Sequence, residues 1–391
     1  MKWILTLLVL APLFSISQNR LNQIADSIKK NNLLLQAINS ENIAYARTLQ
    51  QSLRPSDLEA EFSNLWNGSE YGREISISQS FDFPTNTIRE KKVINHQLMA
   101  MDYKKRIEED NLLFEAKTLF MECVYLNQRI KLLNMRRQLL EKIQADFTKK
   151  MQAGEGNILE LNQSKIELFR ISKQQLEMEN LHLEKHARIR VLNGGKAFEI
   201  QDTIYPVLPN IEGLQQIKEN LVQSDPRHAW MEEEMNAIVS KITLGKSLWL
   251  PQIQIGYKLE QTPVQTLNGV RLGISFPLWK TLGSSQTAKA EYAAAMLRHQ
   301  DHVAEHLREM ETLYAKLESL KKSKEIGYEI IAKSNMENLL KKSFELGQIS
   351  SIDFFTSLNG YYQAVEDFLH TEMEFQICWL QLTRYETLNP N

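Results

Sequence analysis

Cysteine is scarce in this sequence, which has only Cys123 and Cys378 among its 391 residues. Two cysteines cannot supply the framework of disulfides that stabilises small secreted domains. An excess of positive charge is also missing, since the formal net charge is −2, and this argues against a nucleic-acid partner. The sequence contains no GxSxG, HExxH, phosphate-binding P-loop or cysteine-rich metal motif. We therefore expect neither an enzyme nor a protein with a bound cofactor.

Long apolar runs are absent after the first residues of the chain. The run from Trp3 to Phe14 follows Lys2 and precedes small residues that end at Ser17, which is typical of a secretory signal peptide over residues 1–17. The run is shorter than the about 20 residues of a membrane-spanning helix, which argues against an anchor. No cysteine lies near the predicted cleavage site, so we expect no lipid anchor, and we expect no transmembrane helix in the mature chain.

The sequence contains an internal duplication. Two sets of short motifs recur with the same offset of 193 residues (277−84 and 347−154). The recurring motifs are Phe83-Pro84 with Phe276-Pro277, and Gly154 and Glu160 with Gly347 and Asp353. This predicts a first repeat over 18–194, a linker over 195–225 and a second repeat over 226–391. Each repeat is expected to contain a helix, two strands, a long helix and a return helix.

Four segments alternate between apolar and polar residues, which predicts strands at about 56–66, 71–83, 251–260 and 268–278. Their apolar residues are Leu58, Ala60, Phe62, Ile75, Ile77, Phe81, Phe83, Ile253, Ile255, Tyr257, Leu259, Val270, Leu272, Ile274 and Phe276. Alternation over about ten residues is typical of membrane β-barrel strands, although a half-buried sheet of a soluble domain has the same pattern. A membrane barrel needs about eight strands and tolerates no open edge, so several chains would have to share one barrel. Three chains would contribute twelve strands.

The predicted helices are unusually long. No proline or glycine occurs from Asn86 to Lys149, and a second long helix is expected from about Ser284 to Leu346. Return helices are expected over about 158–192 and 352–385. The first long helix carries a stripe with coiled-coil spacing, broken once by a charged residue. The stripe consists of Leu112, Ala116, Leu119, Cys123, Leu126, Ile130, Leu133, Arg137 and Leu140, which predicts that Cys123 is a buried free thiol.

The sequence resembles the TolC-like outer-membrane efflux family over essentially the whole mature chain. The most specific segments are Leu250–Tyr257, Gly269–Leu278 and Ser343–Phe355. The resemblance implies a mainly α-helical homotrimer with a shared twelve-stranded β-barrel in the outer membrane of a Gram-negative bacterium and a twelve-helix periplasmic tunnel. It also implies end-to-end docking on a periplasmic adaptor (a membrane fusion protein) and an inner-membrane pump of the RND type.

The turns between long and return helices are the expected functional sites. Glycine supplies the left-handed conformation that ends a helix, and an acidic residue favours the start of the next one. The expected adaptor contacts are Gly154, Asn157, Ile158, Gly347, Ser350 and Ile352, and the expected gate residues are Asp353, Glu160 and Thr356. The resemblance places Asp353 at the tunnel constriction, where three carboxylates would form a ring. Thr356 stands where well-known members have a further aspartate. Both acidic residues could instead serve only as helix-start residues.

Histidines form two helical stripes. His299, His302 and His306 follow one helix face, and His182 and His186 lie four residues apart. Imidazoles at these spacings could bind one metal ion together. The ending of the chain at Asn391 also resembles the heavy-metal resistance branch of the family. Helix packing or solvent exposure is the commoner explanation, so no metal site is assigned.

These observations predict the outer-membrane exit duct of a tripartite efflux system, a passive conduit for small molecules or metal ions. Two alternatives stay open. One is a type I protein-secretion duct, which has the same tunnel geometry. The other is a soluble periplasmic coiled-coil scaffold, which explains the long helices but not the strand pairs.

Overall fold

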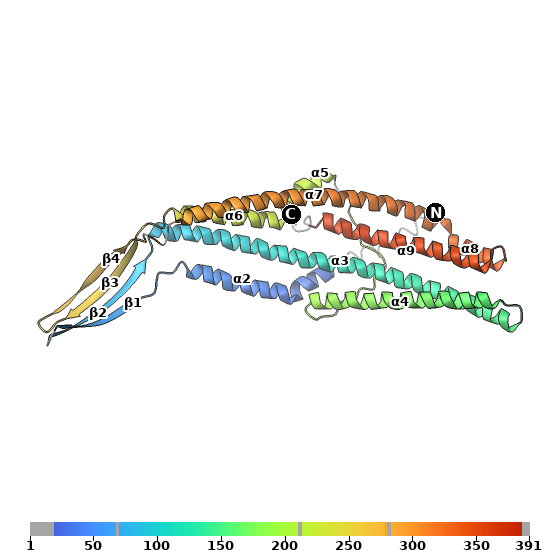
Figure 1. The fold of residues 1–391 in the computed structure, drawn as a ribbon, viewed down its shortest axis with the longest axis horizontal. Coiled ribbons are helices and arrows are strands. Elements are labelled where there is room, and N and C mark those ends of the chain that lie inside the picture. Colours follow the sequence, from blue (N-terminus) through green and yellow to red (C-terminus); the bar gives the residue numbers. More distant parts are fainter. Residues whose placement is uncertain (1–18, 68–69, 210–212, 278, 280–282, 385–391) are drawn as a thin grey trace. The chain divides into compact units, whose positions relative to one another are not determined.

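The computed structural model describes residues 19–67, 70–209, 213–277, 279 and 283–384 (Figure 1). The predicted signal peptide, residue 278 and the end of the chain from 385 therefore lie outside the described residues. The helices are residues 19–31, α2 (Leu33–Gln51), α3 (Pro84–Gln152), α4 (Ile158–Leu192), α5 (Leu214–Ser224), α6 (Pro226–Gly245), α7 (Ser284–Ser334), α8 (Met336–Glu345) and α9 (Ser351–Leu382). The strands are β1 (Glu59–Asn67), β2 (Glu70–Phe81), β3 (Gln252–Gln261) and β4 (Thr266–Ser275).

The chain divides into two compact units. The strand unit comprises Gln36–Ile107 and Asp225–Glu305. The bundle unit comprises the segment that ends at Leu35, Glu108–Ser224 and the segment that begins at His306. Among the described residues, no helix has both the length and the apolar character that crossing a membrane requires.

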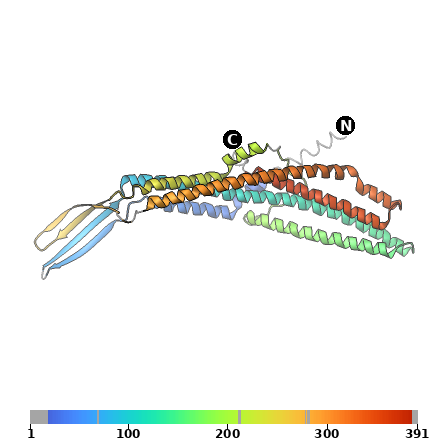
Figure 2. The same ribbon diagram turned by 45° about the horizontal axis from the view of Figure 1, so that its top comes forward.

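The strand unit contains one antiparallel sheet in the order β1-β2-β3-β4. The four strands lie side by side in both views (Figures 1 and 2). Each of the four segments predicted from alternation overlaps one of these strands, with ends that differ by a few residues. One row of paired residues crosses the whole sheet and consists of Ala60, Ile77, Tyr257 and Val270. Because side chains alternate between the faces of a strand, this register puts the predicted apolar residues of the four strands on one face.

Equivalent elements of the two repeats begin 193 residues apart (226−33, 252−59 and 351−158). The element pairs are α2 with α6, β1 with β3, and α4 with α9. Pro84 begins α3, where proline suits the first turn because its missing N–H group has no intrahelical partner there.

The first long helix forms as expected. α3 has 69 residues, which corresponds to about 100 Å at about 1.5 Å per residue. Most of its predicted stripe is buried, including Leu112, Cys123 and Leu133. The second long helix, predicted from about Ser284 to Leu346, is instead two helices, because α7 ends at Ser334 and α8 begins at Met336.

Asn335 between α7 and α8 has a φ of 43°, in the left-handed region. Asparagine tolerates this conformation better than most residues because its short side chain can form local hydrogen bonds. Its Oδ1 accepts a hydrogen bond from Asn338 Nδ2 at 2.6 Å. A helix can therefore break here without the glycine or proline that usually marks a break in the sequence.

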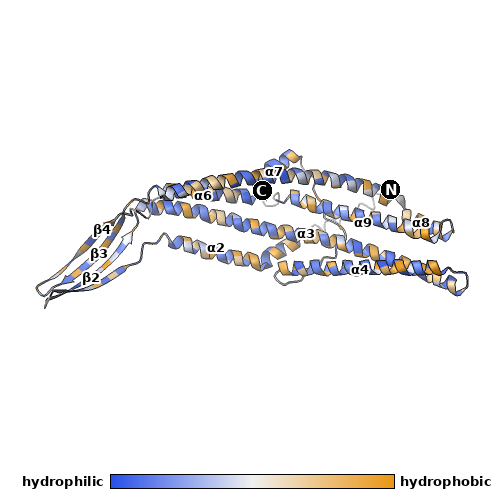
Figure 3. Ribbon diagram, viewed as in Figure 1, coloured by the Kyte–Doolittle hydropathy of each residue, from blue (hydrophilic) through white to orange (hydrophobic). Residues whose placement is uncertain are grey.

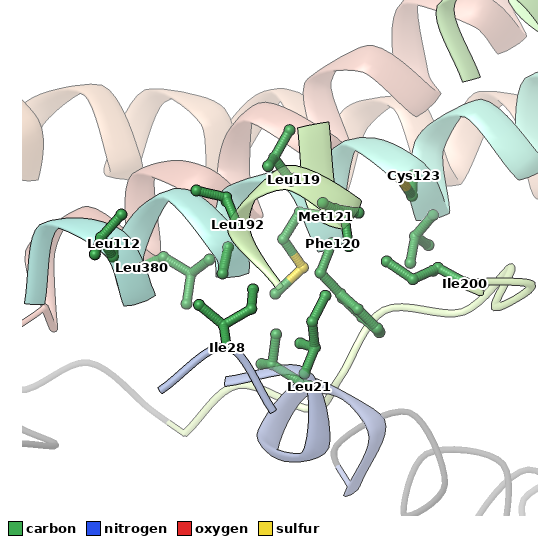
Figure 4. Packing of buried hydrophobic residues seen from close by; sticks show 14 of the residues in the cluster. Leu21, Ile28, Leu112, Leu119, Phe120, Met121, Cys123, Leu192, Ile200 and Leu380 are labelled. Carbon is green, nitrogen blue, oxygen red and sulfur yellow. The ribbon is translucent and has the colours of Figure 1, made fainter. Parts of the chain in front are cut away.

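The largest apolar core of the bundle unit gathers residues 21–35 with parts of α3, α4 and α9 (Figure 4). Phe120 and Cys123 of α3 are fully buried there, beside Ile28 and Ile200. Cys123 and Cys378 are both free and buried, which confirms the prediction for Cys123. Burial raises the pKa of the Cys123 thiol to about 12, so this thiol is protonated and unreactive near neutral pH.

Candidate functional site

The sheet of the strand unit exposes its apolar face. Val270 and Leu272 are 74% and 75% exposed, whereas Ser76 and Ser78 on the opposite face are only 4% and 7% exposed. Figure 3 shows the alternation of apolar and polar residues along the strands. A half-buried sheet of a soluble domain would cover its apolar face and expose its serines. The exposed apolar face is the arrangement that suits a sheet in lipid.

The polar face of the same sheet is held by contacts between strands. Gln254 Nε2 donates to Ser78 Oγ at 3.0 Å, and Lys258 Nζ lies 3.0 Å from Glu74 Oε2. Gly256 lies between these rows, and a Cβ there would approach the carbonyl oxygen of Ile77 to 2.7 Å. The polar side chains therefore satisfy one another on one face and leave the other face mainly apolar.

The two helix turns of the bundle unit have the same geometry. Gly154 and Gly347 have φ values of 76° and 68°. The Gly154 N–H donates to the Met151 carbonyl at 3.2 Å, and the Gly347 N–H donates to the Phe344 carbonyl at 3.0 Å. In each turn the next N–H also reaches back five residues, as in the Schellman motif that ends many helices. The predicted role of both glycines in ending the helices is confirmed.

The return helices begin at equivalent capping residues. Asn157 Oδ1 accepts a hydrogen bond from the Leu159 N–H at 2.9 Å, and Ser350 Oγ accepts one from the Asp353 N–H at 3.1 Å. Both residues were predicted only as adaptor contacts, and the structure shows that each also starts a helix. Ile158 and Ile352 next to these caps are largely exposed.

The expected gate residues lie within the first turns of α4 and α9. Glu160 is half-buried and accepts a hydrogen bond from Ser351 Oγ, which ties the two turns together. Asp353 is exposed, and its Oδ2 lies 2.7 Å from Ser350 Oγ. Thr356 is exposed one turn further along α9. The three residues therefore share one end of the bundle unit.

A groove of about 970 Å³ lies between the end of α3 and the turn from α8 to α9. Apolar side chains line it, including Phe147, Phe344 and Phe354. Lys142, Lys149, Lys150, Lys341, Asp146, Glu160, Glu337 and Glu345 supply charges of both signs along it. The groove therefore combines apolar and charged side chains beside the turn from α8 to α9.

A buried charge cluster links three helices of the bundle unit. Arg136 Nη1 of α3 lies 3.0 Å from Glu366 Oε1 of α9, and Arg129 Nη2 lies 2.9 Å from Glu366 Oε2. Asn359 bridges Arg136 to Glu167 of α4 through hydrogen bonds of 3.2 and 3.1 Å. Burial lowers the pKa of the Arg136 guanidinium, and the charge of Glu366 opposes that shift.

This cluster was not predicted from the sequence. Arg137 was identified as the charged residue in the apolar stripe of α3, but its neighbour Arg136 is the buried one. The signal available in the sequence was Glu366, which continues the apolar stripe of Phe355, Leu358 and Tyr362 on α9.

The histidines lie in two separate places. His182 and His186 of α4 have their Nε2 atoms 3.1 Å apart, and burial lowers the pKa of both. His299 and His302 of α7 lie in the strand unit near His228, which was not among the predicted site residues. His306 follows His302 by one turn of α7 and is buried.

The fold, in which a strand pair, a long helix and a return helix occur twice, is like that of solved outer-membrane channels. No protein-family model matches the sequence, and no curated protein matches it at a significant level. Solved structures do match the fold. They include CusC, with 14% identity, coverage of 93% of this chain and 91% of that chain, and a TM-score of 0.77.

Two further matches come from named bacteria. A membrane protein from Pseudomonas aeruginosa has 13% identity, coverage of 94% of this chain and 90% of its own, and a TM-score of 0.80. The CmeC outer membrane channel of Campylobacter jejuni has 14% identity, coverage of 94% and 85%, and a TM-score of 0.73. At these identities the likeness establishes the fold, over nearly the full length of each chain.

Proposed function

We propose that this protein is the outer-membrane exit duct of a tripartite efflux system, with a periplasmic extension. The observation that carries the proposal is the exposed apolar face of the four-stranded sheet, which lipid would cover. The fold shared with outer-membrane channels and the family motifs quoted above support it. The duct would be a passive conduit for small molecules or metal ions, with its energy supplied by the inner-membrane partner.

The sheet also supports a homotrimer. Its outer strands, β1 and β4, each pair on one side only within the part of the chain that the structure describes. Unpaired strand edges are not tolerated in lipid, so these edges must pair with other chains. Three chains would close a barrel of twelve strands, and their long and return helices would form a tunnel of twelve helices.

The helix turns would carry the gate and the docking surface. Three copies of Asp353 would form a ring of carboxylates at the constriction, with Glu160 and Thr356 beside it. A periplasmic adaptor would contact Gly154, Asn157, Ile158, Gly347, Ser350 and Ile352 and enter the groove behind the turns. The adaptor would join the duct to an inner-membrane pump of the RND type.

The native mass of protein extracted in detergent from isolated outer membranes tests the proposal. We expect a trimer in the outer-membrane fraction. A monomer released with the soluble periplasmic fraction would contradict the duct and favour the coiled-coil scaffold.

Site-specific photo-crosslinking in cells tests the docking surface. Ile352 at the turn and Ile330 on the side of α7 are both exposed apolar residues, so they form a matched pair of crosslinker positions. We expect a crosslink to the adaptor from position 352 and not from 330. If the crosslinked adaptor belongs to a protein-secretion system, the result would favour the type I secretion duct over the efflux duct.

A further inference from the structure

The bundle unit contains a small cavity that the proposed duct does not use. The cavity is lined by residues of helix 19–31, of α3, of the segment from Val207 to Pro209 and of the end of α9, and its volume is about 180 Å³. We propose that it binds a small organic acid with one carboxylate and an apolar body of one aromatic ring. We call it the Lys117 cavity. The proposal does not depend on the transport function.

Most of the residues that line the Lys117 cavity are apolar. Four of the lining residues come from α3, and they share one helix face because they lie three, four and seven positions apart. These four are Asp110, Leu113, Phe114 and Lys117. The apolar residues from the other segments are Leu21, Val207, Leu208, Pro209, Trp379 and Leu380. Such walls favour a ligand that has an apolar body, because burying it removes apolar surface from water.

Contacts between the segments hold these walls in place. Trp379 Nε1 donates a hydrogen bond to the Pro209 carbonyl at 3.2 Å, which ties the segment before α5 to α9. The Arg384 guanidinium lies over the ring of Phe114, with Cζ 4.8 Å from the ring centroid. These contacts join α3, the 207–209 segment and the end of α9, so the cavity exists before any ligand binds.

Among the described residues, three charged side chains line the cavity, and two of them are paired with each other. Arg384 Nε donates to Asp110 Oδ2, and Arg384 Nη2 donates to Asn111 Oδ1 at 2.5 Å. Lys117 differs from both, because no described residue makes a hydrogen bond or an ion pair with its ammonium group. The cavity therefore has one positive charge that the described residues leave without a close partner.

The surroundings of Lys117 favour an anionic ligand. The residue is half-buried, and burial lowers the pKa of its ammonium group, while the charge of Asp110 opposes this shift from a longer distance. A bound carboxylate would also oppose the effect of burial, because a nearby opposite charge favours the charged form of the lysine. The carboxylate would accept a charge-assisted hydrogen bond from the ammonium group.

The size and charge of the cavity limit the ligand further. An apolar cavity of about 150 Å³ binds benzene, so about 180 Å³ accommodates one aromatic ring with a carboxylate. One ammonium group balances a single negative charge, whereas a dicarboxylate would bring a second charge against apolar walls at a high cost. Asn22 also lines the cavity, and its amide group can donate a hydrogen bond to the second carboxylate oxygen. Benzoate and its close analogues have these properties.

The internal duplication indicates that the fold does not require a lysine at this position. Adding 193 to 117 gives Met310 of α7, which is buried in an apolar cluster with Leu317 and Leu382. The equivalent helix position of the second repeat is therefore apolar. A lysine can also cover apolar surface with its stem and extend its ammonium group to water. That alternative predicts no saturable binding of an acid, so a titration separates it from the proposal.

Titration of the whole protein in detergent with 4-fluorobenzoate tests the proposal, with calorimetry and the fluorine resonance as readouts. We expect one saturable site per chain with a Kd below about 1 mM. The neutral analogue 4-fluorobenzyl alcohol has the same ring without the charge, and it should bind at least about tenfold more weakly. This comparison uses only the wild-type protein, so it does not depend on the folding of a variant.

Lys117→Met removes the charge and introduces the residue type that the second repeat has at this position. It should lower the affinity for 4-fluorobenzoate by at least about tenfold. Lys131→Met is the matched control, because Lys131 is an exposed lysine of the same helix that does not line the cavity. The control should bind 4-fluorobenzoate like the wild type. Circular dichroism and the thermal midpoint will show that both variants are folded.

Three results would overturn the proposal. The first is the absence of a saturable site for 4-fluorobenzoate in the wild type. The second is equal affinity for the acid and the alcohol, which would show that the ammonium group of Lys117 does not contribute to recognition. The third is an unchanged affinity for the acid in folded Lys117→Met, which would place the binding site elsewhere in the molecule.

Discussion

Arg136 and Glu366 lie 230 residues apart in the sequence and form a buried ion pair between Nη1 and Oε1 at 3.0 Å. The pair joins the long helix of the first repeat to the return helix of the second. The Arg136 guanidinium also lies over the ring of Tyr362, with Cζ 4.4 Å from the ring centroid. One buried carboxylate of the second repeat therefore pairs with two arginines of the first repeat, Arg129 and Arg136.

We expect Glu366→Ala to lower the free energy of unfolding by about 3–5 kcal/mol, because it leaves the guanidinium groups of Arg129 and Arg136 buried without their carboxylate. Denaturant unfolding of the detergent-solubilised protein measures this loss. Glu141→Ala is the control, because it breaks only the half-exposed pair with Arg137 and should cost at most about 0.5 kcal/mol. Equal losses of unfolding free energy in the two variants would show that the buried ion pair stabilises the protein no more than the half-exposed one.

Gly347→Ala should destabilise the protein by about 1–2 kcal/mol, because alanine is strained at the φ of 68° that ends α8. Gly360 provides a control within α9, where an added Cβ meets no atom within 4 Å. Gly360→Ala should be neutral or stabilising by up to about 1 kcal/mol, because alanine favours helix. Thermal unfolding measures the midpoint of both variants, and we expect opposite changes. A decrease of the midpoint in both variants would contradict the turn geometry.

Ile255→Arg should impair assembly in the outer membrane, with a cost of about 2–4 kcal/mol if the residue lies near the middle of the bilayer. Gln254→Arg places the same charge one residue earlier on the polar face, near Glu59, and should assemble normally. The amount of trimer in isolated outer membranes measures both effects. Normal assembly of Ile255→Arg would show that this face does not contact lipid.

Asp353→Asn separates the two roles considered for this carboxylate. It removes the charge that a ring at the constriction requires, while the side chain keeps an oxygen near Ser350. If Asp353 lines the constriction, single-channel recordings in planar bilayers should show altered cation conductance or block. Glu184→Ala, which removes an exposed carboxylate from α4, should leave the recordings unchanged. Wild-type traces from Asp353→Asn would leave this residue with a helix-start role only.

Much of the fold could be predicted because its signals are local. Alternation located the four strands, and the motif around Gly154 located the turn and the return helix from Ile158 to Leu192. Periods of two and of 3.6 residues reflect where consecutive side chains point, so they can be read without knowing any partner. The break at Asn335 carried no such signal, because asparagine is compatible with a helix as well as with the left-handed conformation.

The clusters of side chains could not be predicted in the same way. His228 lies 71 residues before His299, and nothing in the sequence links the two. The sequence stripe of His299, His302 and His306 indicated one helix face but not the carboxylate or the imidazole that approach it from α6.

The sequence by itself determined the duplicated order of helices and strands, the glycine turns and the two sets of residues on each strand, because each depends on neighbours in the chain. Only the tertiary structure decided which face of the sheet is exposed and which charges are buried together. Burial depends on residues far apart in the sequence, such as Glu366 with Arg136 and Asp225 with His302. Long-range packing brings these partners together, and no local period encodes it.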